Sequence, residues 1–150
     1  FIPSGQWERK DAALSTTHDL PTLAGWWSGQ DIAWHARLGA GQSVLAREGK
    51  ERAKDRSRLW QTLRDGDAAE GLRPSADAPD RFVDAAFRAL ASTPCRLKLL
   101  PVEDFIGGRE QPNIPGTIDE HPNWRRRLGS DHPLEGRAVR RRAAFLKQPP

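Results

Sequence analysis

Two short apolar segments, at residues 11–17 and 95–102, limit most strongly what this chain can fold into. Each segment starts apolar and turns polar toward its C-terminal end: His18-Asp19 follow the first, and Glu103-Asp104 end the second. The long stretch between them has helical patterning, and strands that alternate with helices build a parallel sheet. The sequence therefore predicts an α/β fold that is rich in helix, with about two parallel strands in this chain.

Three helices are predicted between the strands. The first covers residues 22–38, with a break near Gly29, and the second covers residues 43–66. The second helix has large apolar side chains only near its ends, so we expect a solvated helix that docks by those ends. The third covers residues 79–91, with Pro79 in its first turn and capping chemistry from Asp77 and Asp80. Its stripe of apolar residues at helical spacing predicts a core helix: Phe82, Val83, Ala86, Phe87 and Leu90.

A long polar segment, residues 109–133, follows the second strand and precedes a last predicted helix at residues 135–147. It is rich in Pro, Gly, Asn and Asp, and it is longer than structureless loops usually are. The rigid turn residues of "QPNIPG" and "DEHPNWRRR" favour an ordered, functional loop over a linker.

Two strands cannot close a barrel or protect their own edges, so the chain is expected to be part of a larger fold. Chemistry at the C-terminal ends of parallel strands is typical of (β/α)8 barrels, where strand ends meet at one mouth. The absence of Met and the opening "FIPSGQWERK" point weakly to the same interpretation. Residues 1–150 are thus read as one fragment, the C-terminal portion of a TIM barrel.

Composition removes several classes of function. No apolar run approaches the roughly 20 residues that cross a bilayer, and there is no signal pattern, so we expect a cytoplasmic protein with no membrane partner. The single Cys95 is expected to be a small buried residue at a strand start.

The net charge is +4, with seven arginines between Arg125 and Arg142. A nucleic-acid surface is one interpretation of these arginines. A solvated helix with loop anchors is the preferred one, because no aromatic residues interleave with Arg140–Arg142.

Two long motifs in register give the chain a family resemblance. "STTHDLPTLAGWWSGQDI", followed far downstream by "LLPVEDFIGGREQPNIPGTIDEHPNWRRRL", resembles the C-terminal part of 4-α-glucanotransferases, the amylomaltases or disproportionating enzymes related to α-amylases. The resemblance extends from about Phe1 to Leu128. It implies transfer of α-1,4-glucan segments between maltooligosaccharides by a retaining double displacement, which uses two carboxyl groups about 5–5.5 Å apart.

The resemblance also implies the roles of individual residues. By the match to "STTHD", Asp19 is a third carboxylate that stabilises the transition state, and His18 contacts sugar hydroxyls beside it. The alternative is that Asp19 caps the helix that starts after Pro21. Asn113 matches a position that faces the substrate cleft, and the alternative is a left-handed turn residue. Trp124 is either a stacking surface for glucose or a loop anchor, and Asn123 and His121 remain similarly open.

Other candidates are assigned to the scaffold. Trp26 and Trp27 are expected to pack behind the first strand end, and Glu103 and Asp104 to support the site or contact neighbouring sugar units. No metal or organic cofactor is called for, because sugar transfer by carboxylates needs none.

The family's nucleophile and acid/base have no counterpart here, so this chain is expected to be inactive without the missing N-terminal portion of the same enzyme. The alternatives are a stand-alone α-glucan-binding or regulatory remnant and a basic nucleic-acid-binding module. The expected partners are α-1,4-glucans and that N-terminal portion, with no nucleic acid.

Overall fold

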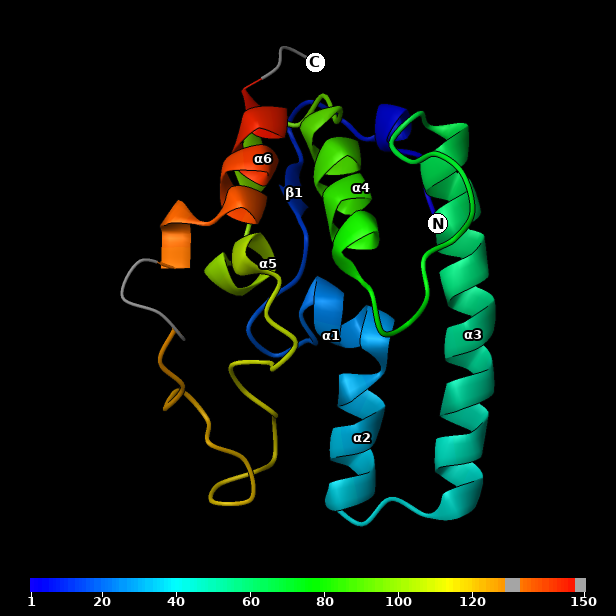
Figure 1. Ribbon diagram of the computed structural model, residues 1–150, viewed down its shortest axis with the longest axis vertical. Coiled ribbons are helices and arrows are strands. Elements are labelled where there is room, and N and C mark those ends of the chain that lie inside the picture. The colour runs from blue at the N-terminus through cyan, green and yellow to red at the C-terminus, as the bar shows by residue number, and fades with distance from the viewer. Residues whose placement is uncertain (129–132, 148–150) are drawn as a thin grey trace.

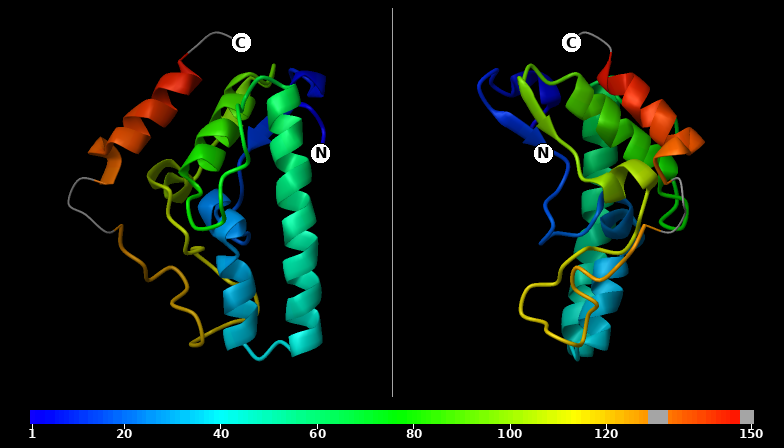
Figure 2. Two further views of the ribbon diagram at one scale, coloured as in Figure 1. Left: turned by 45° about the vertical axis from the view of Figure 1, so that its right-hand side comes forward. Right: turned by 90° about the vertical axis from the view of Figure 1, so that its left-hand side faces the viewer.

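The computed structural model describes residues 1–128 and 133–147. Two short strands lie at one side of a set of helices, and the long loop after α5 runs down beside α2 (Figures 1 and 2). The elements are a 3-10 turn Ser4–Gln6, β1 Ala12–Leu14, α1 Leu23–Ser28, α2 Gln30–Arg37, α3 Gln42–Asp65, α4 Asp80–Ala91, β2 Leu97–Leu99, α5 Val102–Ile106, a 3-10 turn Pro133–Glu135, and α6 Arg137–Leu146. Residues 129–132 of the predicted loop and residues 148–150 lie outside the described part of the chain.

The two strands pair in parallel, as predicted, with Ala12 opposite Leu97 and Leu14 opposite Leu99. Ala13 is fully buried, whereas the leucines of β2 are about half exposed, Leu97 at 52% and Leu99 at 47%. The apolar run of the second strand favours burial on both faces, as in the middle of a parallel sheet, but this expectation is wrong for this chain. Each strand is also shorter than predicted, since only three residues of each make the ladder.

The acidic pair Glu103-Asp104 was predicted to end the second strand, and this prediction is wrong. The pair lies in the first turn of α5. Pro101 explains the difference, because a proline has no N–H to donate to the ladder and is well suited to start a helix. It forms the N-cap of α5 at φ −60° and ψ 145°. Both acids consequently stand near the start of a short helix that follows β2.

The helices follow the sequence pattern closely. Gly29, at φ 82°, ends α1 and starts α2, which confirms the predicted break. Helix α3 is 24 residues long and buries only Trp60 and Leu63, both near its C-terminal end, while its first half contacts α2 through Glu48 and Arg52. In α4 the apolar stripe is buried as predicted, except for the half-buried Ala86. Pro79 is the N-cap with no side-chain capping bond, so the predicted cap from Asp77 is not formed.

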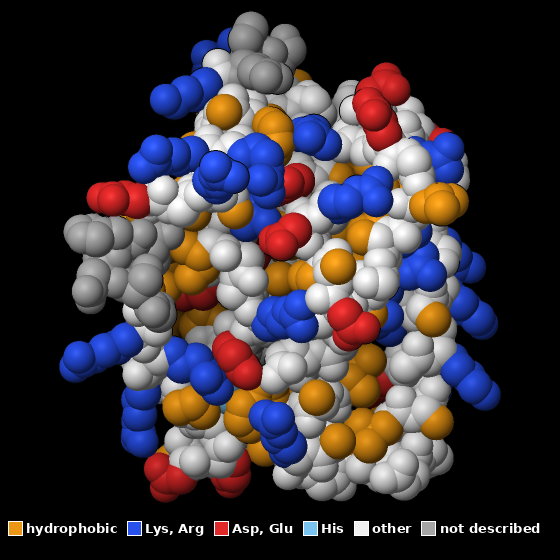
Figure 3. Space-filling view, viewed as in Figure 1, with side chains coloured by type: hydrophobic (Ala, Val, Ile, Leu, Met, Phe, Trp, Pro, Cys, Tyr) orange, Lys and Arg blue, Asp and Glu red, His pale blue; other side chains and the backbone are white. Residues whose placement is uncertain are grey.

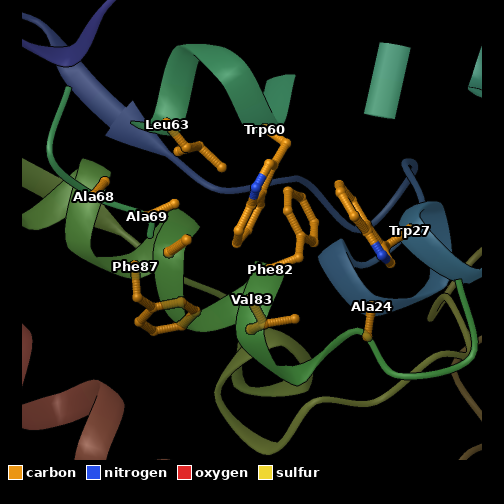
Figure 4. Close-up of a cluster of buried hydrophobic side chains, with 10 residues drawn as sticks. Ala24, Trp27, Trp60, Leu63, Ala68, Ala69, Phe82, Val83 and Phe87 are labelled. Carbon is orange, nitrogen blue, oxygen red and sulfur yellow. The ribbon is translucent and has the colours of Figure 1, made fainter. Parts of the chain in front are cut away.

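The core is an aromatic cluster between α1, α3 and α4 (Figure 4). Trp27 is fully buried and stacks on Phe82 with ring centroids 4.1 Å apart, and Trp60 lies 6.2 Å from Trp27. Trp26 packs against the same cluster. The prediction that both tryptophans of "GWW" serve packing is confirmed, and so is the burial of Cys95, at 3% exposure.

The prediction that the arginines of α6 line a solvated face is wrong for one of them. Arg142 is fully buried, although other Lys and Arg side chains are exposed over α6 and along the outer edge of α3 (Figure 3). Its guanidinium donates to Asp84 at 2.9 Å, to Asp80 at 3.1 Å and to the Phe105 carbonyl at 2.7 Å. Arg142 thereby ties α6 to α4 and α5.

Candidate functional site

Three segments meet beyond the end of β1. The first, residues 15–22, connects β1 to α1 and carries His18 and Asp19. The other two, residues 111–113 and 121–124, belong to the long loop after α5. They lie about a hundred residues from the first segment in sequence, and they follow β2, which pairs in parallel with β1.

Asp19 is the centre of these contacts. Its Oδ1 accepts a hydrogen bond of 2.6 Å from Asn113 Nδ2, and its Oδ2 lies 3.4 Å from His18 Nε2. Gln111 Nε2 donates to the Asn113 carbonyl at 2.5 Å and to the Asp19 carbonyl at 3.5 Å. Both side chains stay accessible, with His18 57% and Asp19 48% exposed. The site is therefore a carboxylate with an amide donor on one side and an imidazole on the other, open to solvent.

Trp124 adds an aromatic surface to this group. Its ring centroid lies 5.0 Å from that of His18, and its side chain is 65% exposed, so it is not a buried anchor. Its φ of 59° is left-handed, which is uncommon for a large side chain and carries strain. Its backbone N–H donates to Pro112 O at 3.0 Å, which fixes the strained turn to the 111–113 segment.

Asn123 and His121 hold the loop from inside. Asn123 Oδ1 accepts from the Ile114 N–H at 3.0 Å and lies 2.8 Å from His121 Nδ1, while its Nδ2 donates to Thr117. His121 is 1% exposed and packs edge-on against Trp34 of α2, with centroids 4.6 Å apart. The Asn123 amide is thus fully used within the loop. Asn113, in contrast, has no left-handed backbone, so the turn alternative does not explain it.

Helix α2 supports the loop through Glu110, a residue that the sequence analysis missed. Its carboxylate accepts from Gln30 Nε2 and from Trp34 Nε1, both at 2.8 Å, and pairs with Arg126 at 3.2 Å. Figure 2 shows the loop running beside α2. Residues 109–128 of the loop are therefore held in a defined conformation, as their turn-rich composition predicts.

A cavity of about 980 Å³ adjoins this group of residues. His18 and Trp124 line it, together with Glu103, Arg109 and Arg126. The walls of the cavity are mostly apolar and carry a few polar groups, which is typical of small-molecule binding sites. Among residues 1–128 and 133–147, no three His, Cys, Asp or Glu side chains are grouped to hold a metal ion, and no helix is long and apolar enough to cross a membrane.

Asp104, unlike Glu103, is fully buried and does not line the cavity. It accepts hydrogen bonds from Ser15 Oγ and the Leu23 N–H. Burial raises the pKa of its carboxyl group, and the charge of Glu103 acts in the same direction. No sequence pattern indicates these two bonds directly, beyond an acidic residue placed near a strand end.

The fold is that of part of an amylomaltase. The crystal structure of amylomaltase from Corynebacterium glutamicum superposes on 98% of this chain with a TM-score of 0.85 at 23% identity, and the match covers 23% of that protein.

The family model described as 4-alpha-glucanotransferase matches residues 1–131, so the chain belongs to the 4-alpha-glucanotransferase family. The 4-alpha-glucanotransferase of Mycobacterium tuberculosis is 34% identical over 98% of this chain and 21% of its own length. That of Haemophilus influenzae is 28% identical over 85% of this chain and 19% of its own length. The chain thus spans about a fifth of the length of these relatives.

Proposed function

We propose that this chain is part of a 4-α-glucanotransferase that moves α-1,4-glucan segments from one maltooligosaccharide to another. In such a retaining reaction a carboxylate attacks the anomeric carbon while an acid protonates the leaving oxygen. The 4-hydroxyl of a second glucan then displaces the carboxylate and re-forms the α-1,4 bond. Neither catalytic carboxyl group is assigned to this chain. Both would come from the portion that its relatives have in addition.

The role proposed for Asp19 is to stabilise the transition state. A carboxylate can accept hydrogen bonds from two neighbouring sugar hydroxyls, and these bonds strengthen as the ring flattens and its hydroxyls become more acidic. Because the gain is greater in the transition state than in the ground state, it accelerates the reaction. His18, whose Nε2 lies 3.4 Å from Asp19, would contact a hydroxyl beside it.

Asn113 and Trp124 complete the proposed sugar contacts. The Asn113 amide already donates to Asp19 at 2.6 Å and keeps a carbonyl oxygen that can accept from a sugar hydroxyl. The exposed Trp124 ring, beside His18, offers a face for a glucose ring. Asn123 has its amide committed to the loop, so we propose that it positions Trp124 and Asn113 instead of touching sugar.

The observation that carries this proposal is the Asn113–Asp19 hydrogen bond. It joins the two long motifs at one point, next to a cavity, although they are far apart in sequence. An Asp19 that served only as a helix cap would need no such partner. The cap of α1 is Thr22, whose Oγ1 accepts from the Gly25 N–H at 3.0 Å.

We further propose that β1 and β2 are two strands of a (β/α)8 barrel. The half-exposed leucines Leu14, Leu97 and Leu99 leave apolar surface on this two-stranded sheet. Further strands of a larger barrel would cover that surface. The surface is thus one that the missing portion of the enzyme would complete.

The test is maltotriose disproportionation by this chain alone and by the same chain joined to the missing portion of a relative. We expect longer oligosaccharides only from the joined protein, and a loss of roughly 10²–10³ in kcat when Asp19 is replaced by Asn. Longer products from the isolated chain would contradict the assignment of the catalytic acids to another segment. Binding of glucan without any transfer by the joined protein would favour the stand-alone binding module.

A further inference from the structure

One buried carboxylate joins the two ends of the segment that carries His18 and Asp19. Ser15, the first residue after β1, donates its hydroxyl to Asp104 Oδ2 at 2.6 Å. Leu23, the first residue of α1, donates its backbone N–H to Asp104 Oδ1 at 2.7 Å. Residues 15–23 therefore leave a strand and enter a helix at points that are bonded to the same side chain.

Bonds within this segment close it further. Thr16 Oγ1 donates to the Pro21 carbonyl at 2.9 Å, and the Leu20 N–H donates to the Thr17 carbonyl at 3.1 Å. Thr22 Oγ1 donates to Gly108 O at 2.6 Å, just after α5. The segment is thus fastened twice to the connection that follows β2, while the side chains at its tip remain exposed.

Asp104 is itself held firmly. It is fully buried in the first turn of α5, and its backbone N–H donates to Pro101 O at 3.1 Å. Arg142 of α6, also fully buried, donates to the carbonyl of Phe105 at 2.7 Å and approaches that of Asp104 at 3.4 Å. Burying a carboxyl group is costly unless its hydrogen bonds offset the lost hydration. Here the offsetting bonds are those to residues 15 and 23.

We infer that Asp104 is the positioning residue of the His18–Asp19 pair: by bonding Ser15 and Leu23 it fixes the 15–23 segment and presents Asp19 to Asn113. It is not a catalytic residue, because it is fully buried and a substrate cannot reach its carboxyl group. The placement of the segment stands on the contacts alone, and only its importance for sugar transfer rests on the proposed function.

The positioning does not depend on the charge of Asp104. Burial raises the pKa of the carboxyl, Glu103 adds to this effect, and Arg142 opposes it. A neutral carboxyl keeps both partners, since its carbonyl oxygen can accept from Leu23 and its hydroxyl can donate to Ser15 Oγ. An asparagine can do the same, with its amide NH2 in place of the hydroxyl. Asp104→Asn is therefore the conservative variant and Asp104→Ala the disruptive one.

The test measures amide hydrogen exchange over residues 15–23 in the 150-residue chain, with α4 as an internal reporter of the core. Asp104→Ala should speed exchange in residues 15–23 by about tenfold or more relative to any change in α4, because two bonds to a buried acceptor are lost. Asp104→Asn should remain near the wild type, and Ser15→Ala should fall between. The matched control is Asp31→Ala. It removes a carboxylate, 10% exposed, that accepts two bonds from Arg52 away from this segment.

Equal exchange in residues 15–23 for Asp104→Ala and Asp31→Ala would overturn the inference, and so would an Asp104→Asn variant as fast as Asp104→Ala. If Asp104→Ala does not fold, the comparison of Asp104→Asn, Ser15→Ala and wild type decides, since only the second loses a bond to the segment. A parallel titration with maltoheptaose separates the two proposals. Normal exchange effects without sugar binding would contradict the proposed function and leave the positioning role supported.

Discussion

Two glycine-to-alanine substitutions should have opposite effects on stability because of what their new methyl groups meet. A Cβ at Gly25 of α1 would collide with the Arg109 carbonyl and lie 2.8 Å from Thr22 Oγ1. A Cβ at Gly49 of α3 would meet nothing within 4 Å. Both positions are helical, so the gain from a better helix former applies to each.

The magnitudes follow from these surroundings. At Gly49, alanine should stabilise the chain by about 0.5–1 kcal/mol. At Gly25 the same gain is outweighed by overpacking, which costs typically about 1–3 kcal/mol, and by loss of the Thr22 cap, worth about 1 kcal/mol. The net expectation is a destabilisation of about 1–3 kcal/mol. The affected groups are the Thr22 hydroxyl, bonded to Gly108, and the chain at Arg109, two residues before Gln111.

Urea unfolding of the two variants and the wild type is the assay. With an m value of about 1–3 kcal/mol/M, the two midpoints should differ by about 0.5–4 M, with Gly49→Ala the higher. If Gly25→Ala unfolds within about 0.5 kcal/mol of Gly49→Ala, α1 does not press against the 109–113 segment as described, and the reasoning fails.

Three further predictions concern ion pairs, pH and the site. Arg142→Ala should destabilise by about 3–5 kcal/mol in urea unfolding, because it strips partners from buried groups, whereas the half-exposed Arg141→Ala should cost under about 1 kcal/mol. The folded-state pKa of Asp104 is raised, so the native state binds more protons than the unfolded state above about pH 4. The unfolding free energy of the wild type should therefore fall relative to that of Asp104→Asn as pH rises from about 4 to the raised pKa. A wild-type unfolding free energy that rises relative to Asp104→Asn over this range would contradict the raised pKa. Asn113→Ala should change stability by less than about 0.5–1 kcal/mol and weaken maltoheptaose binding by about tenfold, as measured by titration; unchanged binding would remove Asn113 from the site.

The sequence predicted the local secondary structure and the meeting of the two motifs at Asp19 and Asn113. The predicted bounds of α3 are correct within one residue, although its middle has no large apolar side chains, and apolar periodicity predicts α4. Gly29 predicts the break after α1, and the parallel pairing of β1 and β2 follows from the alternation of element types. The resemblance predicts that Asp19 and Asn113 share one site, and their side chains are in fact bonded.

What sequence patterns could not predict are contacts made by polar residues across long separations. Arg142 looks like one of several surface arginines, yet it is fully buried because Asp84 and the carbonyls of α5 supply partners. The strand was expected to continue to Glu103-Asp104, but Pro101 is the N-cap of α5. Asp104 therefore lies in a helix, where it accepts hydrogen bonds from Ser15 and Leu23. The exposure of the β2 leucines depends on which strands lie beside β2, and a local apolar run does not specify those neighbours.

The central claim is that Asp19, with His18 and Asn113 beside it, binds a glucose unit of an α-1,4-glucan. The most direct measurement is a titration of the 150-residue chain with maltoheptaose, followed by tryptophan fluorescence, with a β-linked glucan as control. We predict a saturable change for maltoheptaose alone, lost in Asp19→Ala while the urea midpoint stays unchanged. A wild-type chain that shows no saturable change, or an Asp19→Ala variant that binds equally well, would contradict the account.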